Sequence, residues 1–203
     1  MNVAISLKKL FLNLNRMLKI FLSLAVSFIL SSAFQQVKYV KTKVNEDISL
    51  LLPEDFISMS QADLNAKYVS SKPPLAVYTD YSRTVDLGIN VAYSRWNAED
   101  IEIMKSFYKS TIMGLYDEVQ FLKEGIEEIN GNNFAVFEFV ASVSDEEGAT
   151  LERRAISKYI RIQYTIIRSK TVLFNFSCPA LSRDIWAPVA QHMMESVKIS
   201  KTL

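Results

Sequence analysis

The chain has 203 residues, of which 23 are basic and 22 are acidic, so its formal net charge is +1. A nearly neutral protein has no general electrostatic attraction for nucleic acid, and we expect no nucleic-acid partner. Its single cysteine, Cys178, excludes an internal disulfide. The apolar stretch around Cys178 predicts a small buried side chain rather than a reactive thiol.

The N-terminus predicts a secretory signal peptide over residues 1–33. Four basic residues precede an apolar run at 20–30, and the small residues Ser31 and Ala33 follow it. The run is shorter than the ~20 apolar residues that a spanning helix needs. We therefore expect an exported protein, periplasmic or secreted, that begins at Phe34 and keeps no stable membrane span. An uncleaved anchor and a true start at Met17 are the alternatives.

Removal of residues 1–33 takes away four basic residues and no acidic one, so 19 basic residues face 22 acidic ones and the net charge becomes −3. The 170 residues that are left suffice for one domain with a full core. The polar stretch 34–47 is predicted as an N-terminal tail, and 48–203 as a single domain.

Apolar periodicity predicts both strands and helices in this domain. Period-two alternation is clearest at 85–93, and a stripe of apolar residues every three or four positions marks a long helix after Asn97. In chain order we expect a strand at 48–52, a short helix from an N-cap at Ser60, strands at 75–79 and 85–93, the long helix, strands at 119–129, 133–143, 156–167 and 172–178, and a closing helix from about Asp184.

Two hairpins dominate the second half of the chain. Asn130-Gly131 predicts a tight turn because both residues accept positive φ. The strand that follows, 133–143, is apolar on both faces, which predicts an interior strand with helices on each side. The elements together predict an α+β fold, in which an antiparallel sheet of about six to seven strands lies between helices as an α/β/α sandwich.

The last hairpin, 156–178, is the expected centre of the core and turns at Arg168-Ser169-Lys170. We expect its apolar rows to form one continuous face, with Phe174 buried between the sheet and a helix. The apolar rows are Ile156, Ile160, Ile162, Tyr164 and Ile166 on the first strand, and Val172, Phe174, Phe176 and Cys178 on the second. The opposite face carries Arg161, Gln163, Thr165, Asn175 and Ser177.

The catalytic inventory is nearly empty. His192 is the only histidine and is expected on the surface, so neither a Ser-His-Asp triad nor a two-histidine metal site can be built. No phosphate-binding glycine motif occurs. We therefore predict no catalytic residue, no cofactor and no metal site. The runner-up is a carboxylate-dependent hydrolase built from Glu124, Glu127, Glu128 and Glu138, and a third reading is a carrier of an apolar ligand between the sheet and the long helix.

Charge is segregated along the sequence. Residues 117–147 contain nine acidic residues and one basic residue, whereas 153–178 contain six basic residues and no acidic one. Cross-strand ion pairs such as Glu138 with Arg161 would absorb this charge, each contributing ~0.2 to 1 kcal/mol. The alternative is a partner-binding surface, for which Arg153 and Arg154 are the predicted residues.

The element order resembles the PsbP-like fold. The segments that carry the resemblance are Leu51-Leu52-Pro53-Glu54-Asp55-Phe56, the Asn130-Gly131 hairpin and the helix end Met194-Glu195-Ser196-Val197-Lys198. The fold is shared by the photosystem protein PsbP, the DcrB-like proteins and a Ran-binding import factor. The resemblance implies a non-enzymatic accessory or chaperone-like envelope protein that holds a protein partner, and it supplies no catalytic residues. The only cysteine, Cys178, lies far from the apolar run, so the site of a DcrB-like lipid attachment is not expected here.

Overall fold

The computed structural model describes residues 37–60, 62–64, 73–143 and 156–203. One compact unit runs from Lys38 to Leu203. The predicted signal peptide and the candidate binding residues Arg153 and Arg154 lie outside the described residues.

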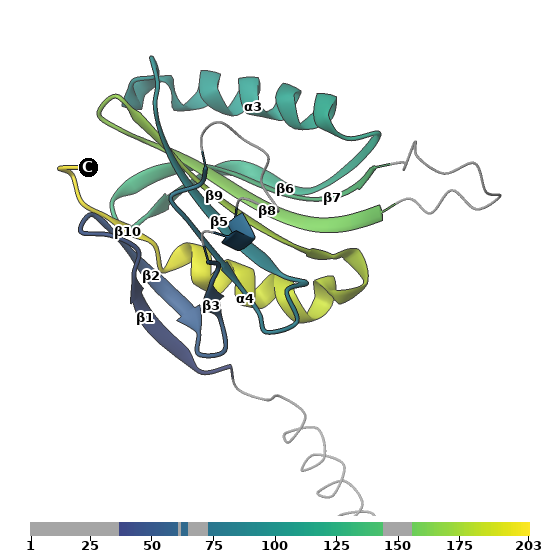
Figure 1. Ribbon diagram of the computed structural model, residues 1–203. Coiled ribbons are helices and arrows are strands. Elements are labelled where there is room, and N and C mark those ends of the chain that lie inside the picture. The colour runs from purple at the N-terminus through teal and green to yellow at the C-terminus, as the bar shows by residue number, and fades with distance from the viewer. Residues whose placement is uncertain (1–36, 61, 65–72, 144–155) are drawn as a thin grey trace, which may run out of the picture. The chain divides into compact units, whose positions relative to one another are not determined.

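Antiparallel strands form two sheets in the described part of the chain (Figure 1). The larger has the order β3-β4-β5-β9-β8-β7-β6, and the smaller has the order β1-β2-β10. The strands are β1 (Tyr39–Lys43), β2 (Ile48–Pro53), β3 (Ile57–Ser58), β4 (Ala76–Thr79), β5 (Asp86–Tyr93), β6 (Glu118–Ile129), β7 (Asn132–Val143), β8 (Ile156–Ile167), β9 (Lys170–Pro179) and β10 (Lys198–Ile199).

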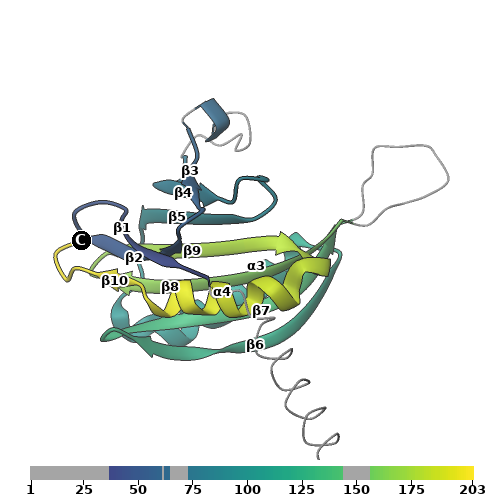
Figure 2. The ribbon, with the colours of Figure 1, turned by 90° about the horizontal axis from the view of Figure 1, so that it is seen from below.

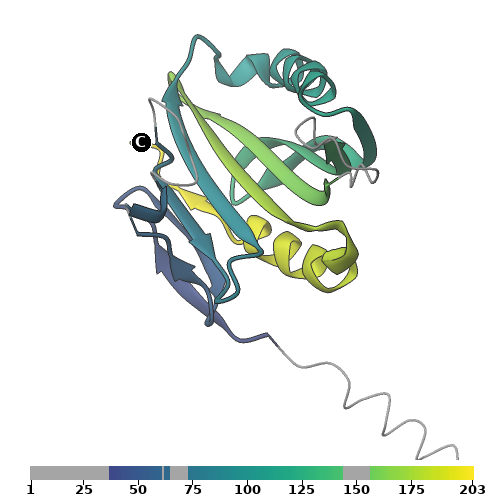
Figure 3. The same cartoon turned by 45° about the vertical axis from the view of Figure 1, so that its right-hand side comes forward.

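Helices cover both faces of the larger sheet, as Figures 1 and 2 show. Helix α3 (Ile101–Leu115) follows the 3-10 turn η1 (Ala98–Asp100) and packs on β6 and β7. Helix α4 (Arg183–Glu195) follows the turn η2 (Ala180–Ser182) and packs on β8, β9 and β2. The smaller sheet lies beside α4 (Figure 3). The predicted α/β/α sandwich is confirmed.

Several local predictions are confirmed at the residues that carry them. Asn130 and Gly131 have φ angles of 50° and 79°, so the predicted turn joins β6 to β7. Strand β7 is interior, with Phe134 in the core below α4 and Phe137 in the core below α3. The Ser60 hydroxyl accepts a hydrogen bond from the Asp63 backbone N–H at 3.2 Å, as expected of an N-cap, although most of the predicted helix lies outside the described residues.

The register of the β8–β9 hairpin differs from the prediction. The turn contains only Arg168 and Ser169, since Lys170 already pairs with Ile167. Ile162 therefore lies opposite Asn175, and Gln163 lies opposite Phe174. A shift of one residue exchanges the two faces of a strand. The expected single apolar face was wrong: the apolar row of β8 faces α3, and that of β9 faces α4.

This register places the polar row of β8 inside the protein. Arg161, Gln163 and Thr165 are each at most 1% exposed. The amide nitrogen of Gln163 donates to the Met194 carbonyl at 3.1 Å, and the Thr165 hydroxyl donates to the Asn133 carbonyl at 2.8 Å. These bonds offset the cost of removing the two side chains from water.

The prediction of an N-terminal tail over residues 34–47 was wrong for its central residues. Residues Tyr39–Lys43 form β1 and pair with β2 from Tyr39 opposite Pro53 to Lys43 opposite Ser49. The partner strand explains the difference, because five residues gain sheet hydrogen bonds only when a neighbour is in place. Ile48, Leu50 and Leu52 of β2 are buried against the core that α4 covers.

Burial of Phe174, which is 0% exposed, confirms its predicted place between the sheet and a helix, and the structure shows that this helix is α4. We expect Phe174→Ala to lower the free energy of unfolding by about 3 to 5 kcal/mol, because it removes a large apolar side chain and leaves a cavity. Urea unfolding measures this change. The matched control is Leu181→Ala, at a fully exposed side chain, with an expected change within about 0.5 kcal/mol. Equal urea midpoints for the two variants would contradict the assigned core.

Candidate interaction surface

The β1–β2 hairpin is fixed by its turn and by the end of the chain. The side-chain oxygen of Asn45 accepts hydrogen bonds from the backbone N–H groups of Asp47 and Ile48, at 2.9 and 2.7 Å. The Asp47 carbonyl accepts from the Ser200 N–H at 2.8 Å. On the same side of β2, which faces away from β1, the Leu51 N–H donates to the Ser196 hydroxyl at 2.8 Å. The small sheet therefore joins two segments that are about 150 residues apart in the sequence.

Three exposed lysines lie on the outward face of this sheet. Lys43 is opposite Ser49 on β2, and Ser49 is opposite Lys198 on β10. Lys43, Ser49 and Lys198 therefore form one row across the three strands of the sheet. Lys41 lies on the same face, two residues before Lys43. We call the side chains of Lys41, Lys43 and Lys198 around Ser49 the lysine face.

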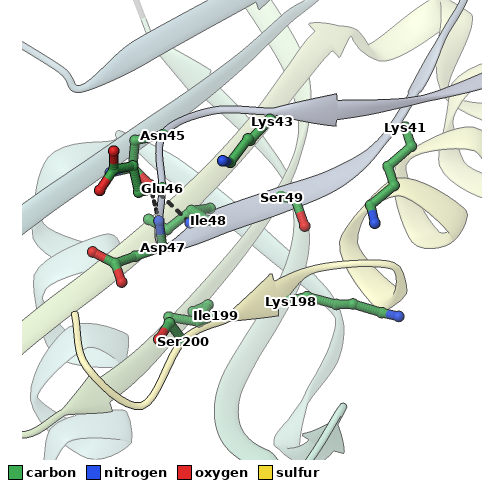
Figure 4. A pocket seen from close by; sticks show the side chains of 10 residues that line it. All are labelled: Lys41, Lys43, Asn45, Glu46, Asp47, Ile48, Ser49, Lys198, Ile199 and Ser200. Atoms are coloured by element: carbon green, nitrogen blue, oxygen red, sulfur yellow. Dashed lines mark hydrogen bonds between the residues drawn. The ribbon is translucent and has the colours of Figure 1, made fainter.

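The lysines of this face are three of the ten residues that line a hollow of about 330 Å³, shown in Figure 4. Ser49 lies between the longer lysine side chains, with Lys43 and Lys198 on its two neighbouring strands. A short side chain between longer ones leaves the sheet surface open at that point. Eight of the ten residues that line the hollow have charged or polar side chains. The hollow therefore suits a polar or charged group.

The three lysines make no ion pair with any described residue. Two acidic residues, Glu46 and Asp47, also line the hollow, but neither is in an ion pair with these lysines. The Asp47 carboxylate accepts a hydrogen bond from the Thr202 hydroxyl at 3.2 Å, and Glu54 pairs with Lys38 at 2.6 Å. Like charges on one sheet face repel each other. An acidic group placed among them would relieve this repulsion.

A second charged group lies on the face of the larger sheet that α4 covers and is centred on the buried Arg161. Arg161 Nη1 lies 2.8 Å from the Glu138 Oε2 atom, which confirms the predicted cross-strand pair. Arg161 Nη2 lies 3.7 Å from Glu127 Oε2, and Glu127 Oε1 lies 2.7 Å from Lys123 Nζ. Burial of the neighbouring Tyr159, together with the Glu138 charge, raises the pKa of its phenol above the usual range.

The four carboxylates considered for a hydrolase do not converge. Glu127 and Glu138 share Arg161, as described above. Glu124 lies on the opposite face of β6 and pairs with Lys109 of α3 at 2.6 Å. Glu128 shares the face of Glu124, because side chains two positions apart or four positions apart in a strand lie on one side. Two of the four candidate carboxylates, Glu124 and Glu128, therefore lie on the α3 side of the sheet. The other two, Glu127 and Glu138, lie on the α4 side with Arg161 between them.

Two other predicted features are confirmed. Cys178 is buried, and burial raises the pKa of its thiol to about 11. His192 is on the surface, and its ring centroid lies 4.3 Å from that of Tyr39.

Among the described residues, no group of three or more His, Cys, Asp or Glu side chains is arranged to hold a metal ion. None of the described helices is both long enough and apolar enough to cross a membrane.

The lysine face was not predicted from the sequence. Lys41 and Lys43 were placed in a tail, although Val40, Thr42 and Val44 alternate with them and an Asn-Glu-Asp turn follows. That short alternation is the one signal from which the strand was predictable. Lys198 belongs to a strand of only two residues, for which no periodic pattern exists.

Solved structures with the same arrangement of elements exist at low sequence identity. Cyanobacterial PsbP (CyanoP) from Synechocystis sp. PCC 6803 has a TM-score of 0.50 at 12% identity, over 83% of this chain and 95% of its own. The Ran-binding protein Mog1p of Saccharomyces cerevisiae has a TM-score of 0.54 at 12% identity, over 81% and 96%. No protein-family model and no curated protein matches the sequence.

The chain has the PsbP/Mog1-like fold. The predicted resemblance is confirmed at the level of the fold. At these identities the likeness concerns the backbone arrangement, and the surface residues have to be interpreted from this chain alone.

The buried position of Arg161 changes the expected energetics of its ion pair with Glu138, for which the sequence predicted only ~0.2 to 1 kcal/mol. We expect Arg161→Met to lower the free energy of unfolding by about 3 to 5 kcal/mol, because it leaves Glu138 partly buried without its partner. Urea unfolding measures the loss. The matched control is Lys123→Met at the exposed end of the same group, with an expected loss below about 1 kcal/mol. A loss for Arg161→Met as small as that of the control would show that the buried pair contributes little.

Proposed function

We propose that this protein is an exported, non-enzymatic accessory or chaperone-like protein of the cell envelope, which binds a protein partner through the lysine face. The observation that carries the proposal is the row of exposed lysines around Ser49, without carboxylate partners among the described residues. Charges of one sign on a binding surface select a partner of the opposite sign and speed its approach. The partner is therefore expected to present an acidic surface or segment.

The alternative functions have weaker support. A carboxylate-dependent hydrolase requires two carboxylates that face one another across a cleft, whereas Glu127 and Glu138 are both bound to Arg161. A carrier of an apolar ligand was expected to have its cavity between the sheet and the long helix. The hollow described above lies on the smaller sheet, and eight of its ten lining residues have polar or charged side chains. The chain's PsbP/Mog1-like neighbours include a protein described as Ran-binding, in keeping with a binding role.

Export is supported by the basic residues, apolar run and small residues of the N-terminus. We expect the protein recovered from the cell envelope or medium to begin at Phe34, because Ser31 and Ala33 occupy the positions that a signal peptidase reads. N-terminal sequencing of the exported protein measures this. An intact Met1 or Met17 end in the membrane fraction would contradict cleavage and favour an uncleaved anchor.

Partner binding is tested by replacing the lysine face in the full-length chain. We expect the triple variant Lys41→Gln, Lys43→Gln, Lys198→Gln to lose most of the envelope protein that the wild type captures after cross-linking, and to show a weaker dependence of capture on salt. Quantitative mass spectrometry of the cross-linked material provides the measurement. Thermal unfolding of the variant should match that of the wild type, because none of the three lysines is in a described ion pair.

The control removes the same charge from other surfaces. Lys105, Lys109 and Lys123 each pair with a glutamate, and their replacement by glutamine should leave capture unchanged. A further variant, Arg153→Gln with Arg154→Gln, tests the binding residues predicted from the sequence. Undiminished capture by the lysine-face variant would disprove the proposed surface, and loss in the Arg153, Arg154 variant alone would move the site to that segment.

A further inference from the structure

Among the described strands, β1 is an edge strand of the smaller sheet, and one row of its backbone groups points away from β2. In the smaller sheet β1 pairs only with β2, at the end of the order β1-β2-β10, among the described strands. The Glu54 N–H donates to the Lys38 carbonyl at 2.8 Å, and the Val44 N–H donates to the Ile48 carbonyl at 2.9 Å. In an antiparallel pair, residues alternate between those that bond to the partner strand and those that do not.

The alternation fixes which residues of β1 are open. Lys38 and Val44 are even-numbered and bond to β2, so the backbone N–H and C=O groups of Tyr39, Lys41 and Lys43 point to the outer edge. Strand β2 provides a check, because its odd-numbered Leu51 donates its N–H away from β1, to Ser196. The open edge thus offers alternate donors and acceptors about 6.8 Å apart along the strand.

The side chains add a charge pattern to this edge. A residue of an added strand that pairs with Lys41 or Lys43 has its side chain on the same face of the sheet, about 5 Å away. Acidic residues at alternate positions would therefore lie beside both lysines. The positions between them would lie beside Val40, which is 44% exposed, and Thr42. Apolar or β-branched side chains suit these positions.

We propose that the partner binds by adding an extended acidic segment to the edge of β1, antiparallel to it, with acidic and apolar residues in alternation. The inference rests on the proposed function and specifies how the lysine face recognises its partner. Main-chain hydrogen bonds supply affinity in this mode, and alternate side chains supply specificity. Every strand pair in both sheets is antiparallel, and the added strand continues that arrangement.

The other long edge of the fold is less suited to the same role. Strand β6 is the outer strand of the larger sheet, but its pairing shifts between Phe121 and Lys123, and such irregularities bend an edge away from added strands. It also carries Glu118, Glu124 and Glu128, which would repel an acidic segment. The register of β1 is regular over its whole length.

The test uses full-length protein and short fluorescent peptides in which glutamate and valine alternate. One peptide is unmodified, a second carries N-methyl groups on two glutamate nitrogens, and a third carries them on two valine nitrogens. In the antiparallel arrangement the glutamate N–H groups face β1 and the valine N–H groups face solvent. Fluorescence anisotropy should show affinity at least about tenfold weaker for the glutamate-methylated peptide, and little change for the valine-methylated one.

Each other outcome overturns the inference. Equal binding of the two methylated peptides would show attraction by side chains without strand addition, and loss by the valine-methylated peptide alone would disprove the antiparallel arrangement. Binding of the unmodified peptide no tighter than that of a lysine-valine peptide would remove the acidic preference. The proposed function fails separately, when capture of the envelope partner does not depend on Lys41, Lys43 and Lys198.

Discussion

The register of the β8–β9 hairpin is the constraint on which the rest of the domain depends. Its two-residue turn, with Arg168 at a φ of 54°, places Ile162 opposite Asn175 and Gln163 opposite Phe174. Each face of the central strand pair therefore receives one apolar row. A sheet that is apolar on both faces has to be covered on both. Helix α3 covers one face, and α4 with the smaller sheet covers the other.

The same register brings a charge into the interior. Arg161 lies opposite the apolar Phe176 on β9 and opposite Glu138 on β7, and its side chain is 1% exposed. An ion pair of this kind is costly to bury and costly to break. A slip of one residue would move Arg161 to the face that α3 covers and separate it from Glu138. The pair thus disfavours the alternative register, in addition to holding β7 and β8 together.

The lysine face lies on strands that contribute little to the main core. Of the smaller sheet, β2 supplies Ile48, Leu50 and Leu52 to the core, whereas β1 and β10 are short and mainly exposed. Their outward side chains are free of packing constraints. A surface built in this way can change its charge without unfolding the domain.

Local patterns in the sequence predicted the features that depend on neighbouring residues. The Asn130-Gly131 turn, the alternation in β5, the α3 stripe and the burial of Phe174 and Cys178 all follow from local patterns. The charge segregation likewise indicated the pairing of Glu138 with Arg161, although it did not indicate that the arginine is buried.

The register of the β8–β9 hairpin, the smaller sheet and the lysine face could be seen only in the tertiary structure. Each of them depends on residues that are distant in the sequence or on a single position in a turn. Whether Lys170 belongs to the turn or to β9 decides whether Phe174 lies on the same face of the sheet as Ile162 or as Gln163. The apolar periodicity of the two strands is the same in both cases. Strand β10 has only two residues and gives no periodic signal, and the short alternation in β1 becomes a strand because β2 lies between β1 and β10. The lysine face follows from that pairing, since Ser49 brings Lys43 and Lys198 into one row.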